Sequence, residues 1–418
     1  MLLSMHKLWR FIMKRIAIIG AGPIGLEAAL YARHIGYDVT IYEKETLASN
    51  VRKWGHVTFF SPFSMNASAL GRHYVSQNND LPDENAYLTG ADFYEGYLKP
   101  LAENSLLKDC LKTNVEVVAI SRTSTLKRDL IGDPKRATFP FRLLLRNEDG
   151  KEWAETADVV LDCSGTWSNP NWLGEGGIPA VGERSLREEL EYGIADLLKQ
   201  SNRFAEKSLL LVGSGHSAAT TLAAFKELHE KSPSSKLIWM TRADEQLTPI
   251  ENDPLAERTR IIEKAALAAK DESVQQISGA NIQSVAKSAD GGYEVTYNIS
   301  GNGDAETIAV DEILACIGHS PDNSIYRELQ IHECYASRGP MSLAAALLGD
   351  SSADCLDQSS KGPEVLKNPE PGFFILGMKS YGTSPNFLLR IGHEQVRDVF
   401  KLINEDEQLD KYAELATA

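Results

Sequence analysis

Ile18-Ile19-Gly20-Ala21-Gly22-Pro23-Ile24-Gly25 is the stretch that decides the fold. The β-branched run at 15–19 predicts a strand, and residues 23–34 predict a helix. The first glycine of the stretch permits a tight turn, the second lets a bound group approach the backbone, and the third lets the helix pack closely on the strand. A strand, turn and helix in this order present unpaired N–H groups to an anion.

An acidic residue follows at the spacing that such a turn needs. The next predicted strand, 38–42, ends at Glu43, roughly 20 residues after the turn. A carboxylate there accepts hydrogen bonds from the ribose hydroxyls of an adenosine half. The pattern therefore indicates a dinucleotide site, and the alternative is a glycine-rich turn in another kind of α/β protein.

The pattern occurs a second time, as Leu211-Val212-Gly213-Ser214-Gly215-His216-Ser217-Ala218. Residues 207–212 predict a strand and 216–230 a helix, with Ala218 in place of the third glycine. After the next strand comes Arg242, where the first copy has its acid. A guanidinium suits a 2′-phosphate and so indicates NADP rather than NAD, whereas the alternative is a solvated surface arginine.

Each copy leads through a hairpin-like stretch to an apolar run ending in Cys-x-Gly, at 157–165 and at 310–318. One glycine motif is weak evidence, but two with the same continuation indicate two dinucleotide-binding units in tandem. A protein that holds two dinucleotides most simply passes electrons between them.

Composition excludes several classes of protein. The net charge of −15 without a basic cluster argues against nucleic acid, and no apolar run approaches the roughly 20 residues that cross a bilayer, so no membrane partner is expected. The five cysteines form neither a Cys-x-x-Cys pair nor a zinc spacing, which favours a cytoplasmic setting and no metal. Residues 1–13 lack a signal-peptide pattern, and we expect either a poorly ordered extension or a start codon placed too early.

Together, the two glycine motifs and the strand ending in Cys163-Ser164-Gly165-Thr166 resemble the flavoproteins with two dinucleotide-binding domains. Within that class the chain is similar to the flavin-containing monooxygenases and to the pyridine nucleotide-disulfide oxidoreductases, from about residue 14 to 403. The resemblance implies that the first unit binds FAD, that an inserted second unit binds NADPH, and that the C-terminal part completes the FAD domain.

The C-terminal part supports this organisation. Residues 372–377 read as an apolar strand and 386–403 as an amphipathic helix, with Thr383 and Ser384 as candidate caps. In such flavoproteins a helix N-terminus points at the flavin. Disulfide reductases of the class carry Gly-Asp after the strand, whereas here Met378 follows Gly377, so the ribityl chain must be bound differently.

Two further departures concern the reaction. No redox dithiol is present, which removes thioredoxin-reductase or glutathione-reductase chemistry and leaves the flavin to act directly. The Phe-x-Gly-x-x-x-His fingerprint of flavin monooxygenases is also absent, and residues 176–180 stand in that region. The segment 52–66 is expected to line the flavin, and Asn66 is the candidate catalytic amide that orients oxygen or a C4a-peroxyflavin; a turn asparagine is the alternative.

We therefore expect an α/β protein of two Rossmann-like domains, with FAD bound by 14–166 and 325–418 and NADPH by the inserted 167–324. The expected reaction is oxygenation of a small-molecule amine, sulfur or carbonyl substrate by molecular oxygen through a C4a-peroxyflavin. The alternatives are an NADPH-dependent reductase or oxidase that serves a quinone, a protein or oxygen, and a non-enzymatic redox sensor. A homodimer is left open.

The residues expected to bind the two cofactors are Gly20, Gly22, Pro23, Gly25, Glu43, Lys44, Arg52, Trp54, Gly213, Ser214, Gly215, His216, Ser217, Arg242, Gly377, Asn386 and Phe387.

Overall fold

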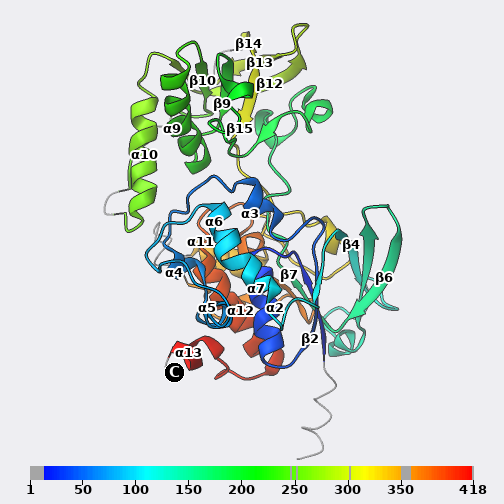
Figure 1. Ribbon diagram of the computed structural model, residues 1–418. Coiled ribbons are helices and arrows are strands. Elements are labelled where there is room, and N and C mark those ends of the chain that lie inside the picture. Colours follow the sequence, from blue (N-terminus) through cyan, green and yellow to red (C-terminus); the bar gives the residue numbers. More distant parts are fainter. Residues whose placement is uncertain (1–13, 245–246, 251–252, 301–302, 350–358, 417–418) are drawn as a thin grey trace, which may run out of the picture. The chain divides into compact units, whose positions relative to one another are not determined.

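The computed structural model describes residues 14–244, 247–250, 253–300, 303–349 and 359–416 (Figure 1). Within these ranges the chain forms two compact units. Unit 1 comprises the described residues of 1–55, 62–168 and 320–418, and unit 2 comprises those of 56–61 and 169–319. The expectations for residues 1–13 and for Cys355 fall outside the described residues.

These bounds differ from the expected ones at three places, namely residues 56–61, 167–168 and 320–324. Residues 56–61 belong to unit 2, where the Phe60 ring lies 5.4 Å from the His216 ring. Residues 320–324 belong to unit 1, where the Ser320 hydroxyl accepts a hydrogen bond from Arg338 at 3.1 Å. The departures at 56–61 and 320–324 both involve side-chain contacts between segments far apart in the sequence. A local sequence pattern therefore does not predict them.

A five-stranded parallel sheet in the order β16-β7-β1-β2-β3 forms the centre of unit 1. Helix α2, Pro23–His34, connects the first two strands, and the expected strands and helix of the first glycine motif are confirmed within one residue. The strands of this sheet are β1 Arg15–Ile19, β2 Asp38–Tyr42, β3 Leu111–Lys112, β7 Val159–Asp162 and β16 Phe373–Ile375.

Helices pack around this sheet, and α2 and α12 lie side by side (Figure 1). The helices and helical turns of unit 1 besides α2 are α3 Ser49–Lys53, α4 Phe63–Asn66, α5 Ala69–Ser76, α6 Gly90–Phe93, a π-helix Tyr94–Leu98, α7 Lys99–Glu103, α11 Met341–Leu348, α12 Leu389–Asn404, α13 Lys411–Ala416, and 3₁₀ turns at Pro134–Thr138, Ser324–Tyr326, Pro363–Leu366 and Gly377–Tyr381.

The start of α12 corrects one expectation. The helix begins at Leu389 rather than at residue 386, and its N-cap residue Leu388 makes no side-chain capping bond. Thr383 and Ser384 do not cap it, because they lie five and four residues before the N-cap position. Their backbone N–H groups bond the carbonyl groups of Ser337 at 2.8 Å and Tyr381 at 3.1 Å.

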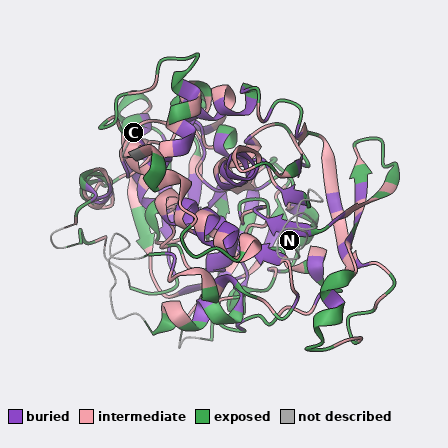
Figure 2. Ribbon diagram, turned by 90° about the horizontal axis from the view of Figure 1, so that it is seen from below, coloured by how far each residue is buried: buried purple, intermediate pink, exposed green. Residues whose placement is uncertain are grey.

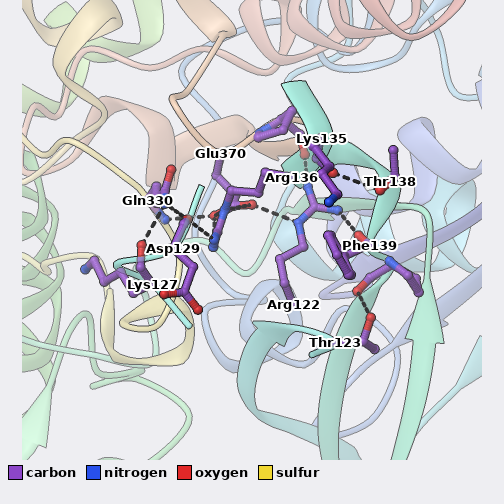
Figure 3. Close-up of polar contacts among 12 residues, drawn as sticks. Arg122, Thr123, Lys127, Asp129, Lys135, Arg136, Thr138, Phe139, Gln330 and Glu370 are labelled. Atoms are coloured by element: carbon purple, nitrogen blue, oxygen red, sulfur yellow. Dashed lines mark hydrogen bonds and ion pairs between the residues drawn. The ribbon is translucent and has the colours of Figure 1, made fainter. Parts of the chain in front are cut away.

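A buried ion cluster anchors the returning C-terminal segment to a small antiparallel sheet (Figure 3). Glu370 accepts a hydrogen bond from Arg122 Nε at 2.8 Å and from Arg136 Nη2 at 2.9 Å, and all three side chains are at most 1% exposed. The Arg122 guanidinium also lies 3.6 Å from the centre of the Phe141 ring. Because an unpaired buried charge costs about 3–5 kcal/mol, this cluster holds the chain firmly just before β16. The antiparallel strands are β4 Val115–Arg122, β5 Phe141–Asn147 and β6 Glu152–Ala157.

Unit 2 repeats the arrangement of unit 1, with a parallel sheet in the order β11-β10-β9-β15-β8 and an antiparallel three-stranded sheet. Its strands are β8 Glu191–Tyr192, β9 Ser208–Val212, β10 Lys236–Met240, β11 Val274–Ile277, β12 Ala280–Lys287, β13 Tyr293–Ile299, β14 Ala305–Val310 and β15 Glu312–Ala315; its helices are α8 Ser201–Phe204, α9 His216–Lys231 and α10 Ala256–Ala268, with 3₁₀ turns at Glu175–Gly177 and Glu183–Leu186.

Both units follow the same packing rule. In unit 2 the inner faces of α9 and α10 bury apolar residues against the sheet: Phe225 of α9 and Trp239 of β10 are at most 2% exposed. Figure 2 shows helical ribbons striped in buried purple and exposed green, as expected of helices with one face against a sheet. The α/β class with two Rossmann-like units, one interrupted by the other in sequence, is therefore confirmed.

Candidate functional site

The two glycine turns have the same backbone conformation, each at the carboxyl end of the central strand of its parallel sheet. Gly20 and Gly213 have φ values of 94° and 126°. Gly22 and Gly215 begin the following helices with φ and ψ of −81° and −176°, and −81° and −175°. The repeat read from the sequence is therefore a repeat in three dimensions.

The glycines of these turns are required for different reasons. A Cβ added at Gly20 would lie 2.8 Å from the Cys163 carbonyl oxygen, and one at Gly213 would lie 2.2 Å from that of Cys316. A Cβ added at Gly22 or Gly215 would meet no protein atom within 4 Å. The first pair of glycines thus serves the fold, whereas the second pair leaves open space at a helix N-terminus, where an anion binds favourably.

The third position separates the two turns. A Cβ at Gly25 would lie 1.9 Å from the Gly20 carbonyl oxygen, so α2 approaches its strand more closely than any side chain allows. Its counterpart Ala218 is fully buried in α9, so the second turn accommodates one methyl group. Pro23 occupies the first position of α2, where its missing N–H costs no helical bond.

Glu43 stands where the sequence predicts it, directly after β2, and is 8% exposed. Its Oε2 accepts the Ala21 N–H at 2.8 Å and its Oε1 accepts the Glu45 N–H at 2.9 Å. The carboxylate therefore holds the glycine turn in shape. Because two carboxylate oxygens have about four acceptor positions, capacity remains for ribose hydroxyls.

Three further expected residues lie near this edge with contacts of their own. Lys44 is exposed. Arg52 donates to the Thr46 hydroxyl at 3.1 Å and lies over the Tyr94 ring. Trp54 packs beside Trp167, with ring centres 5.9 Å apart. These contacts show where the side chains are held, and their role toward a cofactor remains a prediction.

The segment 52–66, expected to line a flavin as one piece, is divided between the two units, since residues 56–61 belong to unit 2. Asn66 is the last residue of α4 and is 3% exposed. Its side chain is thus held inside unit 1 and is no exposed turn asparagine. Its catalytic role remains a prediction.

Sequence reasoning missed a polar trio on the other side of β1, in which Asp162 and Lys379 are buried and Ser164 is half-buried. Asp162 ends β7 and is fully buried, and its Oδ2 lies 2.6 Å from the Lys379 ammonium. Its Oδ1 accepts the Ser164 hydroxyl at 2.6 Å, and Lys379 also donates to the Ser164 Oγ at 3.1 Å. The available signal in the sequence was Asp162, because it is a charged residue at the end of an otherwise apolar strand.

The structure shows the surroundings of Gly377, Asn386 and Phe387, the C-terminal residues expected to bind a cofactor. Gly377 has φ of 71° and packs against Ile24 at the start of α2, and its N–H donates to Gln395 at 2.8 Å. Phe387 packs edge-on to Tyr381 with ring centres 5.4 Å apart, and Asn386 is half-buried beside it. Gly377 thus joins the same sheet edge as the first glycine turn.

In unit 2, Ser214 lies within the second turn, and His216 and Ser217 open α9. Trp239 stabilises this turn by donating its indole N–H to the Gly213 carbonyl at 2.8 Å. Loss of water around the ring lowers the pKa of His216, and the nearby Arg258 guanidinium lowers it further. A neutral imidazole at this helix N-terminus is a hydrogen-bond partner rather than a fixed charge.

Arg242 lies two residues after β10 and is exposed. It makes no ion pair with any residue in the described ranges, and the adjoining Thr241 hydroxyl bonds the Ala243 carbonyl at 2.7 Å. An exposed guanidinium at the carboxyl edge of the sheet is available to an anionic ligand, and its reading of a 2′-phosphate remains a prediction.

The cysteines of the described residues, Cys110, Cys163, Cys316 and Cys334, are all free and buried. Cys163 and Cys316 lie just after β7 and β15 rather than within them, at the two glycine turns. Burial raises the pKa of the Cys163 thiol, and the Asp162 carboxylate raises it further, although Lys379 opposes this. The thiol beside the first turn is therefore kept protonated.

Comparisons with known proteins agree with this geometry. The family described as pyridine nucleotide-disulphide oxidoreductase matches residues 17–126, which contain the first glycine turn. The NAD-dependent dihydropyrimidine dehydrogenase subunit PreT of Salmonella typhimurium and that of Escherichia coli K12 are each 43% identical over 58 residues. The match spans 14% of this chain and only 14% of those relatives.

Solved structures resemble the chain over nearly its whole length. Bacillithiol disulfide reductase Bdr (YpdA) from Bacillus cereus aligns with a TM-score of 0.69 and 16% identity, covering 94% of this chain and 99% of that one. Ornithine N-hydroxylase KtzI from Kutzneria sp. 744 aligns with a TM-score of 0.62 and 13% identity, covering 95% and 100%. The resemblance to both groups of flavoproteins stated from the sequence is confirmed, and at these identities it concerns the fold.

Among the residues that the structure describes, no helix combines the length and the apolar character needed to cross a bilayer.

Proposed function

We propose that this protein is an FAD- and NADPH-dependent oxidoreductase, with FAD bound by unit 1 and NADPH by unit 2. The observation that carries the proposal is the pair of matching turns, in which Gly22 and Gly215 leave open space at two helix N-termini. The names of similar structures support the cofactors, since KtzI was solved with reduced FAD and NADP⁺, and the cadaverine monooxygenase DfoA from Erwinia amylovora with FAD.

Each unit would bind one of the two nucleotides with its own residues. In unit 1 the N-terminus of α2 would hold the pyrophosphate and Glu43 the adenosine ribose. In unit 2 the N-terminus of α9 would hold the second pyrophosphate and Arg242 the 2′-phosphate. When bound, FAD supplies a ring that accepts hydride from NADPH and passes the electrons to an acceptor.

Monooxygenation is the reaction that we propose. Substrate, O₂, NADPH and a proton would give oxygenated substrate, water and NADP⁺, the substrate being an amine, a sulfur compound or a carbonyl compound. One feature favours oxygen over a disulfide as acceptor. The sequence has no Cys-x-x-Cys or Cys-x-x-x-x-Cys pair that could relay electrons from the flavin to a disulfide. Asn66 is the residue proposed to orient the oxygen species.

The amount of NADPH consumed, compared with the amounts of oxygenated product and hydrogen peroxide formed, tests this proposal. The purified protein is given NADPH and a panel of terminal amines, sulfides and ketones, while oxygen uptake, hydrogen peroxide and oxygenated product are measured. One compound that yields one product per NADPH with little peroxide supports the monooxygenase. Peroxide equal to NADPH with every compound would support the rival oxidase, and turnover only with quinones or an electron-transfer protein would support a reductase. Absence of any turnover would favour a redox sensor.

A further inference from the structure

The order of the strands in unit 1 shows on which side of β1 the flavin half of a dinucleotide would lie. Glu43 follows β2 on one side of β1, whereas on the other side Asp162 ends β7 and Gly377 comes after β16, in the strand order β16-β7-β1-β2. A dinucleotide whose pyrophosphate sits at Gly22 and whose ribose reaches Glu43 must extend its other half toward β7 and β16. This placement rests on the proposed function.

The polar trio described above lies on that side. Asp162 is paired in register with Ile19 of β1, the residue before the first glycine turn. On its other side, Asp162 is paired with Ile375 of β16. The Ser164 Cα lies 3.0 Å from where a Cβ on Gly20 would stand. Ser164 therefore borders the first glycine turn, on the side of the flavin half.

The two charged members of the trio leave Ser164 as an oriented acceptor. Its hydroxyl proton is committed to Asp162 Oδ1 at 2.6 Å, so the oxygen offers only lone pairs to other groups. One lone pair takes the Lys379 ammonium at 3.1 Å. One remains, and Ser164 is only half-buried, whereas Asp162 and Lys379 are at most 1% exposed.

Lys379 itself is satisfied inside the protein. Its ammonium contacts Asp162 and Ser164, and the Tyr326 ring centre lies 5.1 Å away on another side. A buried ion pair rarely stabilises a fold more than apolar residues of the same size, so the pair of Asp162 and Lys379 at this edge of the sheet needs another reason. Fixing the direction of one hydroxyl is such a reason.

We infer that Ser164 accepts a hydrogen bond from a ribityl hydroxyl of the bound FAD, and that Lys379 and Asp162 are positioning residues that hold it for this purpose. A ribityl hydroxyl is a donor in need of an acceptor. The chain has Met378 where related reductases carry the aspartate that serves this group. An oxygen polarised by Asp162 provides an acceptor from a different strand.

The test compares binding of FAD and of ADP to the full-length chain freed of flavin, by fluorescence quenching and calorimetry. Ser164→Ala should weaken FAD about tenfold, which is about 1.4 kcal/mol, and leave ADP within twofold, since ADP lacks the ribityl chain. Ser164→Thr keeps the hydroxyl and should restore most of the loss. FAD analogues lacking the 2′-, 3′- or 4′-hydroxyl identify the donor, because one of them should bind wild type and Ser164→Ala equally.

A double-mutant cycle tests the positioning role. Lys379→Met combined with Asp162→Asn removes both buried charges together and should weaken FAD about as much as Ser164→Ala. Adding Ser164→Ala to that pair should then cost less than a further twofold, because the pair acts through the hydroxyl. Full additivity would overturn the positioning role. Ser164→Ala provides a test even where the paired variant does not fold.

The outcomes separate this inference from the proposed function. Wild-type protein that binds neither ADP nor FAD would overturn the proposed function itself. Protein that binds both, with FAD binding unchanged in Ser164→Ala, would overturn only the assignment of Ser164. Equal losses of FAD and ADP would mean that Ser164 supports the glycine turn rather than the flavin half.

Discussion

Substitution of Gly22 by valine separates ligand binding from folding. The glycine has φ and ψ of −81° and −176°, which any residue adopts, and a Cβ there meets no protein atom within 4 Å. The Cβ of a valine at this position therefore meets no protein atom and needs no change of the backbone. Two effects on stability oppose each other. Valine reduces the flexibility of the unfolded chain, which is stabilising, but it is a poor N-cap residue, which is destabilising. We therefore expect the free energy of unfolding to change by less than about 1 kcal/mol.

Binding should suffer far more than stability. The added carbons occupy the space through which a pyrophosphate reaches the N–H groups at the start of α2. A charge-assisted hydrogen bond contributes about 1.5–3 kcal/mol and the helix terminus about 0.3–1 kcal/mol. Loss of two such bonds and the terminus, about 3–7 kcal/mol in all, predicts a dissociation constant for FAD raised by about two-hundredfold to a hundred-thousandfold.

The assay measures flavin content after purification and FAD titration of the flavin-free chain. Gly215→Val is the matched control, since its backbone and surroundings are the same in unit 2. That variant should retain FAD and lose NADPH. Gly25→Ala should instead impair folding, because its Cβ would lie 1.9 Å from the Gly20 carbonyl oxygen. A Gly22→Val protein that folds and binds FAD like wild type would refute the assignment of the first turn.

Three other substitutions give defined outcomes. Arg242→Ala should weaken NADPH about ten- to a hundredfold and scarcely change NADH, from the loss of about 1.5–3 kcal/mol; stopped-flow reduction with both nucleotides decides, and equal losses would exclude a 2′-phosphate contact. Asn66→Ala should leave anaerobic flavin reduction within a few-fold of wild type while product falls and peroxide rises; collapse of reduction would assign the residue to cofactor binding or structure. Glu27 lies in α2, and burial raises its pKa from 4.5 to about 7 although Ser68 and Tyr412 bond it, so the folded chain keeps a proton that the unfolded chain loses. Stability should thus fall by roughly 3 kcal/mol as pH rises from about 4.5 to 7, and urea unfolding of Glu27→Gln, which cannot ionise, should lack that slope.

Local patterns in the sequence were sufficient for the two glycine units. The strand at 15–19, the helix at 23–34 and the acid Glu43 follow from hydrophobic period, turn chemistry and spacing, which act between residues close in the chain. The second copy confirmed the first because the same short-range rules produce the same backbone, down to the matching dihedral angles of Gly22 and Gly215.

Contacts between distant segments decided the rest. Periodicity placed the start of the last long helix at residue 386, but the helix starts at Leu389, and Thr383 before it bonds the distant Ser337 carbonyl. In the trio, Lys379 contacts Asp162 and Ser164, which lie more than 200 positions before it in the sequence. No spacing in the sequence predicts this contact. The sequence by itself determined where the two glycine turns lie, because the strand, turn and helix of each are local. Only the tertiary structure decided which side chains meet beside the first turn, because Asp162, Ser164 and Lys379 come together when separate strands align in one sheet.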